Sequence, residues 1–312
     1  MINFRFHLVS IVAVFLALAV GIVMGYGVLG QPTVDTLQDR IDVVEANAEA
    51  RRIENDELRA DLDQRNSAIA ESSPFSVTDR VADVRAVVIG IRGVDEDAVN
   101  RVVELARRGG ADAPGVVWLE SKWALDSRDD VTALAAALGL TATGRRAPLR
   151  ADALDALVTR LAGGAPQSGI DALRALVDAG FVTLDGAGND APIPADLGGA
   201  GTRATLVIGD EASVPARLLV APIARVAVDE DLPLVAGEVF ADGAEGTNRG
   251  DALTAIRDDE ALDAEVSTVD DLDRIEGAVA AVLALGDLGR GVVGHYGIGD
   301  GADRQLPEWW QL

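Results

Sequence analysis

The residues best suited to chemistry gather in two short segments near the end of the sequence. The first, residues 267–273, is an acidic run that contains Asp270 and Asp271. The second, residues 294–301, is rich in glycine and contains His295. Carboxylate oxygens and an imidazole nitrogen together suit a metal ion that takes oxygen and nitrogen ligands. Asp270, Asp271 and His295 are therefore the candidate metal ligands of the chain.

The same residues have two other interpretations. In the structural one, Asp270 or Asp271 caps the start of a helix and the glycine-rich run is a turn. In the catalytic one, Ser267, Asp270 and His295 form a triad. The sequence contains no Gly-x-Ser-x-Gly elbow, no phosphate-binding loop and no dinucleotide-binding glycine pattern. We therefore predict that the chain has no catalytic residues and is not an enzyme.

The composition limits the partners and cofactors of this chain. Its 51 acidic residues outnumber 27 basic ones, for a net charge of -24, so no basic surplus exists to neutralise nucleic acid. Cysteine does not occur, which excludes disulfides, thiolate metal sites and cysteine nucleophiles. We predict no resident cofactor and no nucleic-acid partner.

The amino-terminal part of the sequence contains a long apolar run that could anchor the chain in a membrane. Residues 8–30 contain no charge and would span about 33 Å as a helix, enough for a bilayer core. A signal peptide cleaved after Ala19 is the alternative, but the apolar run continues well beyond that residue. Arg5 precedes the run and Arg40 is the first basic residue after it. The positive-inside rule then places residues 1–7 in the cytoplasm and the residues after the span, from 31 onward, on the outer side of the cell membrane.

Two patterns predict that this helix associates with a second copy. Within residues 13–25, small residues recur at every fourth position, which suits close helix packing in a membrane. Residues 31–73 form a predicted coiled-coil stalk, and a heptad repeat over residues 34–69 favours a parallel homo-oligomer. The alternative is a single amphipathic helix packed on its own domain, supported by arginines at two core positions. Proline is expected to end the stalk near Pro74. The heptad core positions are Val34, Leu37, Ile41, Val44, Ala48, Arg51, Asn55, Leu58, Leu62, Arg65 and Ile69.

Residues 74–312 are predicted to form one extracytoplasmic α/β domain. An apolar run at residues 84–91, an amphipathic segment at 95–108 and a second apolar run at 115–119 predict a parallel strand–helix–strand unit. We therefore expect a Rossmann-like parallel sheet. The run 203–209 echoes 85–90, which suggests two related halves. Further helices are expected at 131–138, 151–161 and 169–179, and further strands at 181–184, 232–237 and 278–285, the last of which also suits a helix.

Four short motifs lie at the two ends of the chain: residues 7–21 (HLVSIVAVFLALAVG) and, near the end, 267–271 (STVDD), 283–288 (LALGDL) and 294–297 (GHYG). In these motifs the chain resembles the mycobacterial MctB family of copper transport outer membrane proteins. The resemblance implies an actinobacterial envelope protein associated with copper efflux and copper homeostasis, with copper as a transported or transiently bound ion. It also implies an outer-membrane, channel-forming protein.

Two other functions remain open. The heptads and anchor suit a dimeric envelope scaffold that binds an envelope protein partner and has no transport activity of its own. A Rossmann-like domain would also suit an extracytoplasmic enzyme, although a fold alone does not define a function.

Overall fold

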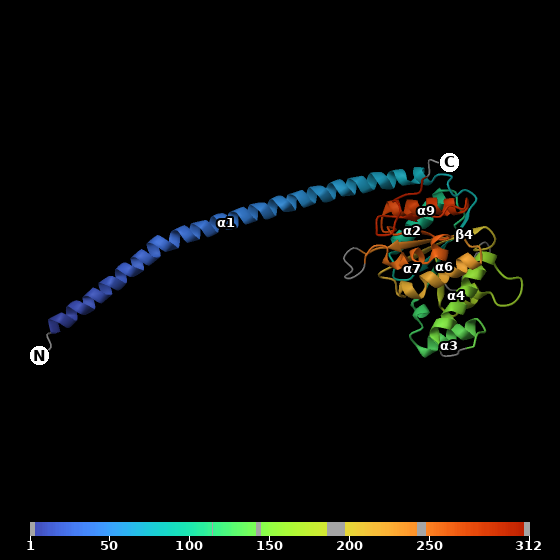
Figure 1. Ribbon diagram of the computed structural model, residues 1–312, viewed down its shortest axis with the longest axis horizontal. Coiled ribbons are helices and arrows are strands. Elements are labelled where there is room, and N and C mark those ends of the chain that lie inside the picture. The colour runs from blue at the N-terminus through green and yellow to red at the C-terminus, as the bar shows by residue number, and fades with distance from the viewer. Residues whose placement is uncertain (1–3, 114, 142–144, 186–196, 242–247, 309–312) are drawn as a thin grey trace. The chain divides into compact units, whose positions relative to one another are not determined.

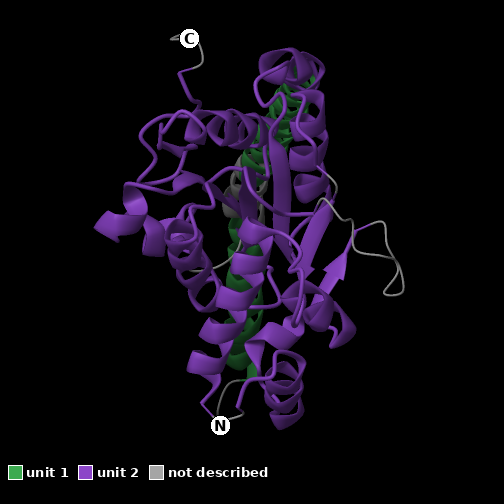
Figure 2. Cartoon of the chain, turned by 90° about the vertical axis from the view of Figure 1, so that its right-hand side faces the viewer, with its two compact units in different colours: residues 1–66 green, residues 67–312 purple. Residues whose placement is uncertain are grey.

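The computed structural model describes residues 4–113, 115–141, 145–185, 197–241 and 248–308. The chain divides into two compact units, Met1–Asn66 and Ser67–Leu312 (Figure 2). Helix α1 (Phe4–Val77) makes up the described part of the first unit and continues into the second. The second unit contains the α/β domain.

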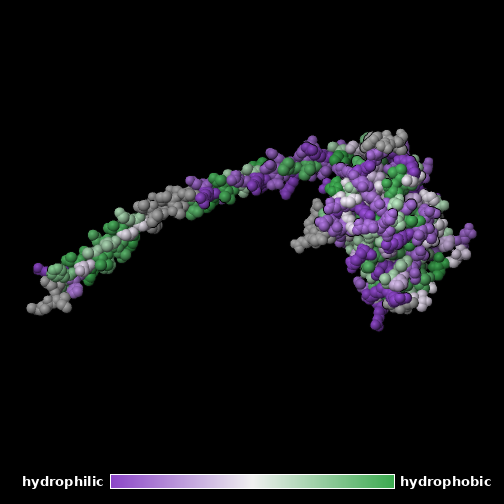
Figure 3. All heavy atoms as spheres, viewed as in Figure 1, coloured by the Kyte–Doolittle hydropathy of each residue, from purple (hydrophilic) through white to green (hydrophobic). Residues whose placement is uncertain are grey.

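The amino-terminal part of α1 carries mostly apolar side chains on the face that Figure 3 shows. Its segment Phe4–Gly25 has 22 residues, a mean hydropathy of 2.8 and no buried part, so its length and composition are those of a membrane span. The predicted span ends at residue 30, and the side chains of residues 26–36 lie outside those that are described.

Five apolar side chains of the heptad core of α1 are solvent-exposed in the single chain. Leu37, Ile41, Val44, Leu58 and Leu62 are each between 51% and 65% exposed. Coiled-coil pairing and oligomer formation stay predictions, because only one copy of the chain is present.

Helix α1 extends beyond the proline that was expected to end it. Pro74 has no N–H to donate to the carbonyl of Ala70, but the Ser73 hydroxyl donates to that carbonyl at 2.9 Å. The extra turn places Val77 in the core of the domain, where it is fully buried. The local loss of one hydrogen bond is thus compensated, and the helix ends at Val77.

A mostly parallel seven-stranded sheet forms the centre of the domain. Its strand order is β3-β2-β1-β4-β5-β6-β7, and only the β2–β3 pair is antiparallel. The predicted strand–helix–strand unit is confirmed, because β1 and β2 pair in parallel and α2 connects them. The strands are β1 (Arg85–Ile91), β2 (Val116–Leu119), β3 (Val182–Leu184), β4 (Thr202–Gly209), β5 (Leu234–Val239), β6 (Ser267–Val269) and β7 (His295–Tyr296).

Helices cover both faces of this sheet (Figure 1). Helix α2 (Glu96–Arg108) packs beside α9 (Ile275–Leu288) on one face, and α4 (Arg146–Gly163) packs beside α6 (Val220–Asp229) on the other. The remaining helices are α3 (Arg128–Ala137), α5 (Ala172–Asp178), α7 (Thr254–Arg257) and α8 (Glu260–Asp263), with 3-10 turns η1 (Ser121–Ala124), η2 (Ala216–Leu218) and η3 (Asp251–Leu253).

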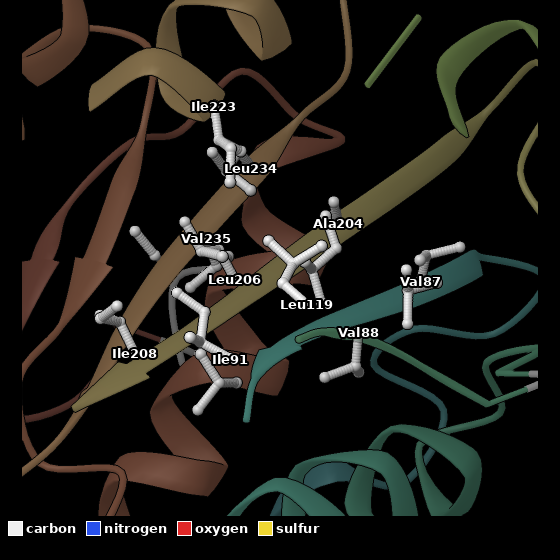
Figure 4. Close-up of a cluster of buried hydrophobic side chains, with 14 of the residues drawn as sticks. Val87, Val88, Ile91, Leu119, Ala204, Leu206, Ile208, Ile223, Leu234 and Val235 are labelled. Carbon is white, nitrogen blue, oxygen red and sulfur yellow. The ribbon is translucent and has the colours of Figure 1, made fainter. Parts of the chain in front are cut away.

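The central strands are apolar on both sides because helices cover both faces of the sheet. Val87, Leu206 and Val235 lie on the central strands β1, β4 and β5 and are almost fully buried (Figure 4). The run 278–285, for which a strand and a helix both stayed open, is the middle of α9. It shows no polar stripe because α9 is buried nearly all round, so periodicity could not distinguish it from a buried strand.

Candidate functional site

Strands β6 and β7 bring the two polar segments of the sequence side by side. They pair in parallel, with Thr268 opposite His295 and Val269 opposite Tyr296. Asp270 and Asp271 follow directly on β6, at the carboxyl edge of the sheet. The two polar segments therefore lie next to each other in the fold, as their residue types suggested.

Asp270 is enclosed by donors from the protein. Its side chain is fully buried, and Oδ1 accepts the backbone N–H groups of Ile298 at 2.9 Å and Gly299 at 3.0 Å. Oδ2 accepts Nη2 of Arg257 on α7 at 3.0 Å. A Cβ on Gly297, whose φ is +127°, would lie 2.1 Å from Oδ1, so only glycine lets the turn approach this closely. The glycine-rich run is a turn folded around the Asp270 carboxylate.

Both ring nitrogens of His295 are engaged as well. Nε2 lies 2.9 Å from Oδ1 of Asp263, and Nδ1 lies 2.9 Å from Oγ1 of Thr268. Thr268 Oγ1 also accepts Nε of Arg257 at 2.9 Å. A neutral ring with its proton on Nε2 fits these partners, since Nε2–H then donates to Asp263 and the Thr268 hydroxyl donates to Nδ1. A continuous network therefore runs from Asp263 through His295, Thr268 and Arg257 to Asp270.

Asp271 is buried without a hydrogen-bond partner. Among the described residues, neither carboxyl oxygen finds a donor. The pKa of Asp271 is raised from 3.8 to about 7, first by burial and then by the nearby charges of Asp270 and Asp273, while Arg249 and Arg274 lower it. Helix α9 packs onto this residue, because a Cβ on Gly277 would lie 2.6 Å from its Oδ1. Near pH 7 this carboxyl is therefore about half protonated.

The helix-capping and triad interpretations do not hold. Helix α9 starts at Ile275 with Arg274 at its N-cap position and no side-chain capping bond. Asp270 instead binds Arg257 and the turn, and the Asp271 carboxyl finds no donor among the described residues. Ser267 Oγ accepts the N–H of Gly294 and His295 bonds Thr268, so these side chains form no triad.

The three candidate metal ligands share a region but do not converge on one point. Across the described ranges, no group of three or more His, Cys, Asp or Glu side chains is arranged to hold a metal ion. A metal at Asp270 or His295 would have to displace the hydrogen bonds that these side chains make. The metal site stays a prediction from residue type.

Several residues of this region were not predicted. Arg257 and Asp263 come from α7 and α8, and Glu238 comes from β5, where it is fully buried. Arg249 binds Asp273 through two hydrogen bonds of 2.5 and 2.9 Å, and its guanidinium stacks 4.6 Å from the Phe240 ring. Only Glu238 had a signal in the sequence, as a lone charge within an apolar run.

A cavity of about 270 Å³ opens beside this network, at the carboxyl ends of β1, β4 and β5. The strand order changes direction between β1 and β4, which is where open parallel sheets most often bind ligands. The wall contains no lysine or arginine among its described residues. Those residues are Val94, Asp95, Gly209, Glu211, Val239, Phe240, Ala241 and Asp273.

These features define a mixed α/β protein that carries an apolar amino-terminal helix and a buried carboxylate–arginine network at the edge of a mostly parallel sheet. The model of one family, described as copper transport outer membrane protein MctB, matches residues 1–307. The chain belongs to this family, as the resemblance at its two ends predicted.

Curated relatives match over nearly their full length. The chain is 28% identical to the copper transporter MctB of Mycobacterium tuberculosis (strain H37Rv) and to that of Mycobacterium bovis, over 97% of this chain and 98% of theirs. It is also 28% identical to the copper transporter MctB of Mycobacterium leprae, with the same coverage.

Proposed function

We propose that this protein is a membrane-anchored envelope protein that takes part in copper efflux and copper homeostasis. The observation that carries the proposal is the match over residues 1–307 to a family whose curated relatives are named copper transporters. The match includes both the apolar helix and the polar network of β6 and β7. Relatives with a transport name also favour a role other than catalysis.

The anchor gives the proposal its topology. Helix α1 would cross the cell membrane once, with residues 1–7 in the cytoplasm and the domain outside, as the distribution of basic residues favours. The family description places its members in the outer membrane. An apolar helix suits the cytoplasmic membrane better than an outer membrane, which proteins typically span as β-barrels. Copper is then a transported or transiently bound ion rather than a resident cofactor.

Copper tolerance tests this function. Deletion of the gene should lower the copper concentration that halves growth, and plasmid-borne wild-type protein should restore it. Zinc tolerance of the same strains is the control, since a general envelope defect would lower both. Equal copper tolerance with and without the protein would refute the proposal.

A second function is favoured by the exposed heptad face of α1. We propose that two copies pair in parallel through residues 13–25 and 34–69, forming an envelope scaffold that binds an envelope protein partner. Arg40 of one copy would face Glu45 of the other, and Glu54 would face Arg59, so both interhelical charge pairs are attractive. Sedimentation of the full chain in detergent tests this pairing. A monomer at all concentrations would refute the scaffold and leave the copper function untouched.

A further inference from the structure

Glu238 is an ionisable residue near the carboxyl end of β5, a strand whose other residues are apolar. Its neighbours on β5 are Gly237 and Val239, and the opposite residue on β4 is Ile208. The side chain is fully buried. One carboxyl oxygen accepts the N–H of Gly250 and the other accepts the N–H of Ala252 at 3.2 Å. Glu238 therefore attaches the segment 248–253 to the sheet from inside the core.

The charged groups that face Glu238 are other carboxylates. Asp210 follows β4 and Asp270 follows β6, on the two strands that flank β5. Asp270 accepts hydrogen bonds from Arg257 and from two backbone N–H groups. Among the described residues, no lysine or arginine forms an ion pair with Glu238.

The cations of this region are committed elsewhere. Arg257 of α7 binds Asp270, and Arg249, within the segment itself, binds Asp273. The pKa of Glu238 is raised from 4.5 to about 7, because burial and the charges of Asp210 and Asp270 raise it more than the two amide hydrogen bonds lower it. A buried carboxyl between two carboxylates, without a cation of its own, holds its proton more tightly than an exposed glutamate does.

We propose that Glu238 is a proton-binding site that couples the attachment of segment 248–253 to pH. When the segment lifts off, water reaches the carboxyl, which then ionises as an ordinary glutamate does. The attached state thus binds the proton more tightly than the lifted state. By linkage, attachment is strongest below about pH 4.5, weakens as the pH rises toward about 7, and changes no further above that value.

Hydrogen exchange of the full chain in detergent measures this attachment. The readout is the protection factor of the Gly250 and Ala252 amides, corrected for the intrinsic exchange rate, between pH 5 and pH 8. This range lies above the pI of about 4.3. In the wild-type protein we expect protection to fall by up to about 100-fold between pH 5 and pH 7, and then to level off.

Three variants identify the responsible group. Glu238→Gln cannot ionise, so its protection should not depend on pH. Asp210→Asn removes a facing charge, so the fall should be smaller and should level off at a lower pH. Asp229→Asn, an exposed residue at the end of α6, should behave as the wild type does.

Two results would overturn the proposal. One is a wild-type protection factor that stays constant from pH 5 to pH 7. The other is an equal fall in Glu238→Gln. If Glu238→Gln does not fold, Asp210→Asn decides, because an unchanged fall in that variant contradicts the proposal. Neither result depends on whether the protein transports copper.

Discussion

Arg257 and Asp270 form a buried ion pair, with Nη2 of the arginine 3.0 Å from Oδ2 of the aspartate. The two side chains are 8% and 0% exposed. This pair joins α7 to the end of β6. Asp270 also binds the turn after β7 and so joins that turn to the same two elements. A single carboxylate therefore connects three segments that are distant in sequence.

Removing the arginine should destabilise the domain strongly. Arg257→Ala leaves Asp270 charged, buried and without its cation, which typically costs about 3–5 kcal/mol. The matched control is Arg225→Ala, which breaks the exposed pair with Asp259 and should cost about 1 kcal/mol or less. Chemical denaturation of the full chain measures both free energies of unfolding. Equal losses of unfolding free energy in the two variants would show that the buried pair stabilises the domain no more than the exposed pair does.

Gly297 should tolerate no side chain. Gly297→Ala would place a Cβ 2.1 Å from Asp270 Oδ1, in addition to the cost of a positive φ. Gly291→Ala is the control, because that residue also has a positive φ, +73°, but no atom within 4 Å of its Cβ position. The backbone cost alone is about 1 kcal/mol, so we expect Gly297→Ala to lose at least about twice as much stability as Gly291→Ala. Similar thermal midpoints for both variants would contradict the close approach.

Asp271 should make stability depend on pH. Its pKa is raised from 3.8 to about 7 in the folded protein, so the folded state binds the proton more tightly. Stability from this group is complete below about pH 4 and is lost as the pH rises to about 7. Since one pKa unit corresponds to about 1.4 kcal/mol, Asp271→Asn should exceed the wild type at pH 8 by roughly 2–4 kcal/mol and by less at pH 5.

The measurement is denaturant unfolding at both pH values, with exposed Asp178→Asn as the control. A variant that is less stable than the wild type at pH 8 would show that the Asp271 carboxylate is well solvated or paired.

The heptad face of α1 predicts a selective loss of oligomerisation. Leu58→Asp combined with Leu62→Asp puts charges at two core positions and should convert the dimer to a monomer in sedimentation experiments. Ile53 lies at an outer heptad position and is 49% exposed, so Ile53→Asp should leave the dimer intact. Dissociation by Ile53→Asp alone would place the contact on another face of the helix.

The sequence predicted those parts of the fold whose patterns are strong and local. Strands β1 and β2 are continuous apolar runs, and α2 between them has a clear polar face, so all three were found. Strands β6 and β7 were missed because they have three and two residues, and their polar side chains point into hydrogen bonds rather than into the core. Helix α9 was ambiguous because burial on all sides removes its periodicity.

The polar site was predicted by residue type but not by role. Acidic and histidine segments were expected to act together, and β6 and β7 do lie side by side. Their hydrogen-bond partners, Arg257 and Asp263, come from short helices whose position depends on the tertiary fold. Sequence spacing therefore could not show that Asp270 and His295 are already bonded by the protein.

Cell-associated copper tests the central claim most directly. Elemental analysis would compare cells that lack the gene, cells complemented with the full chain, and cells complemented with a version lacking residues 1–30, after growth at one copper concentration. Copper efflux through a membrane-anchored protein predicts higher copper in the deletion strain, a return to the wild-type amount with the full chain, and no return without the apolar helix. Equal copper in the deletion and wild-type strains would contradict the account.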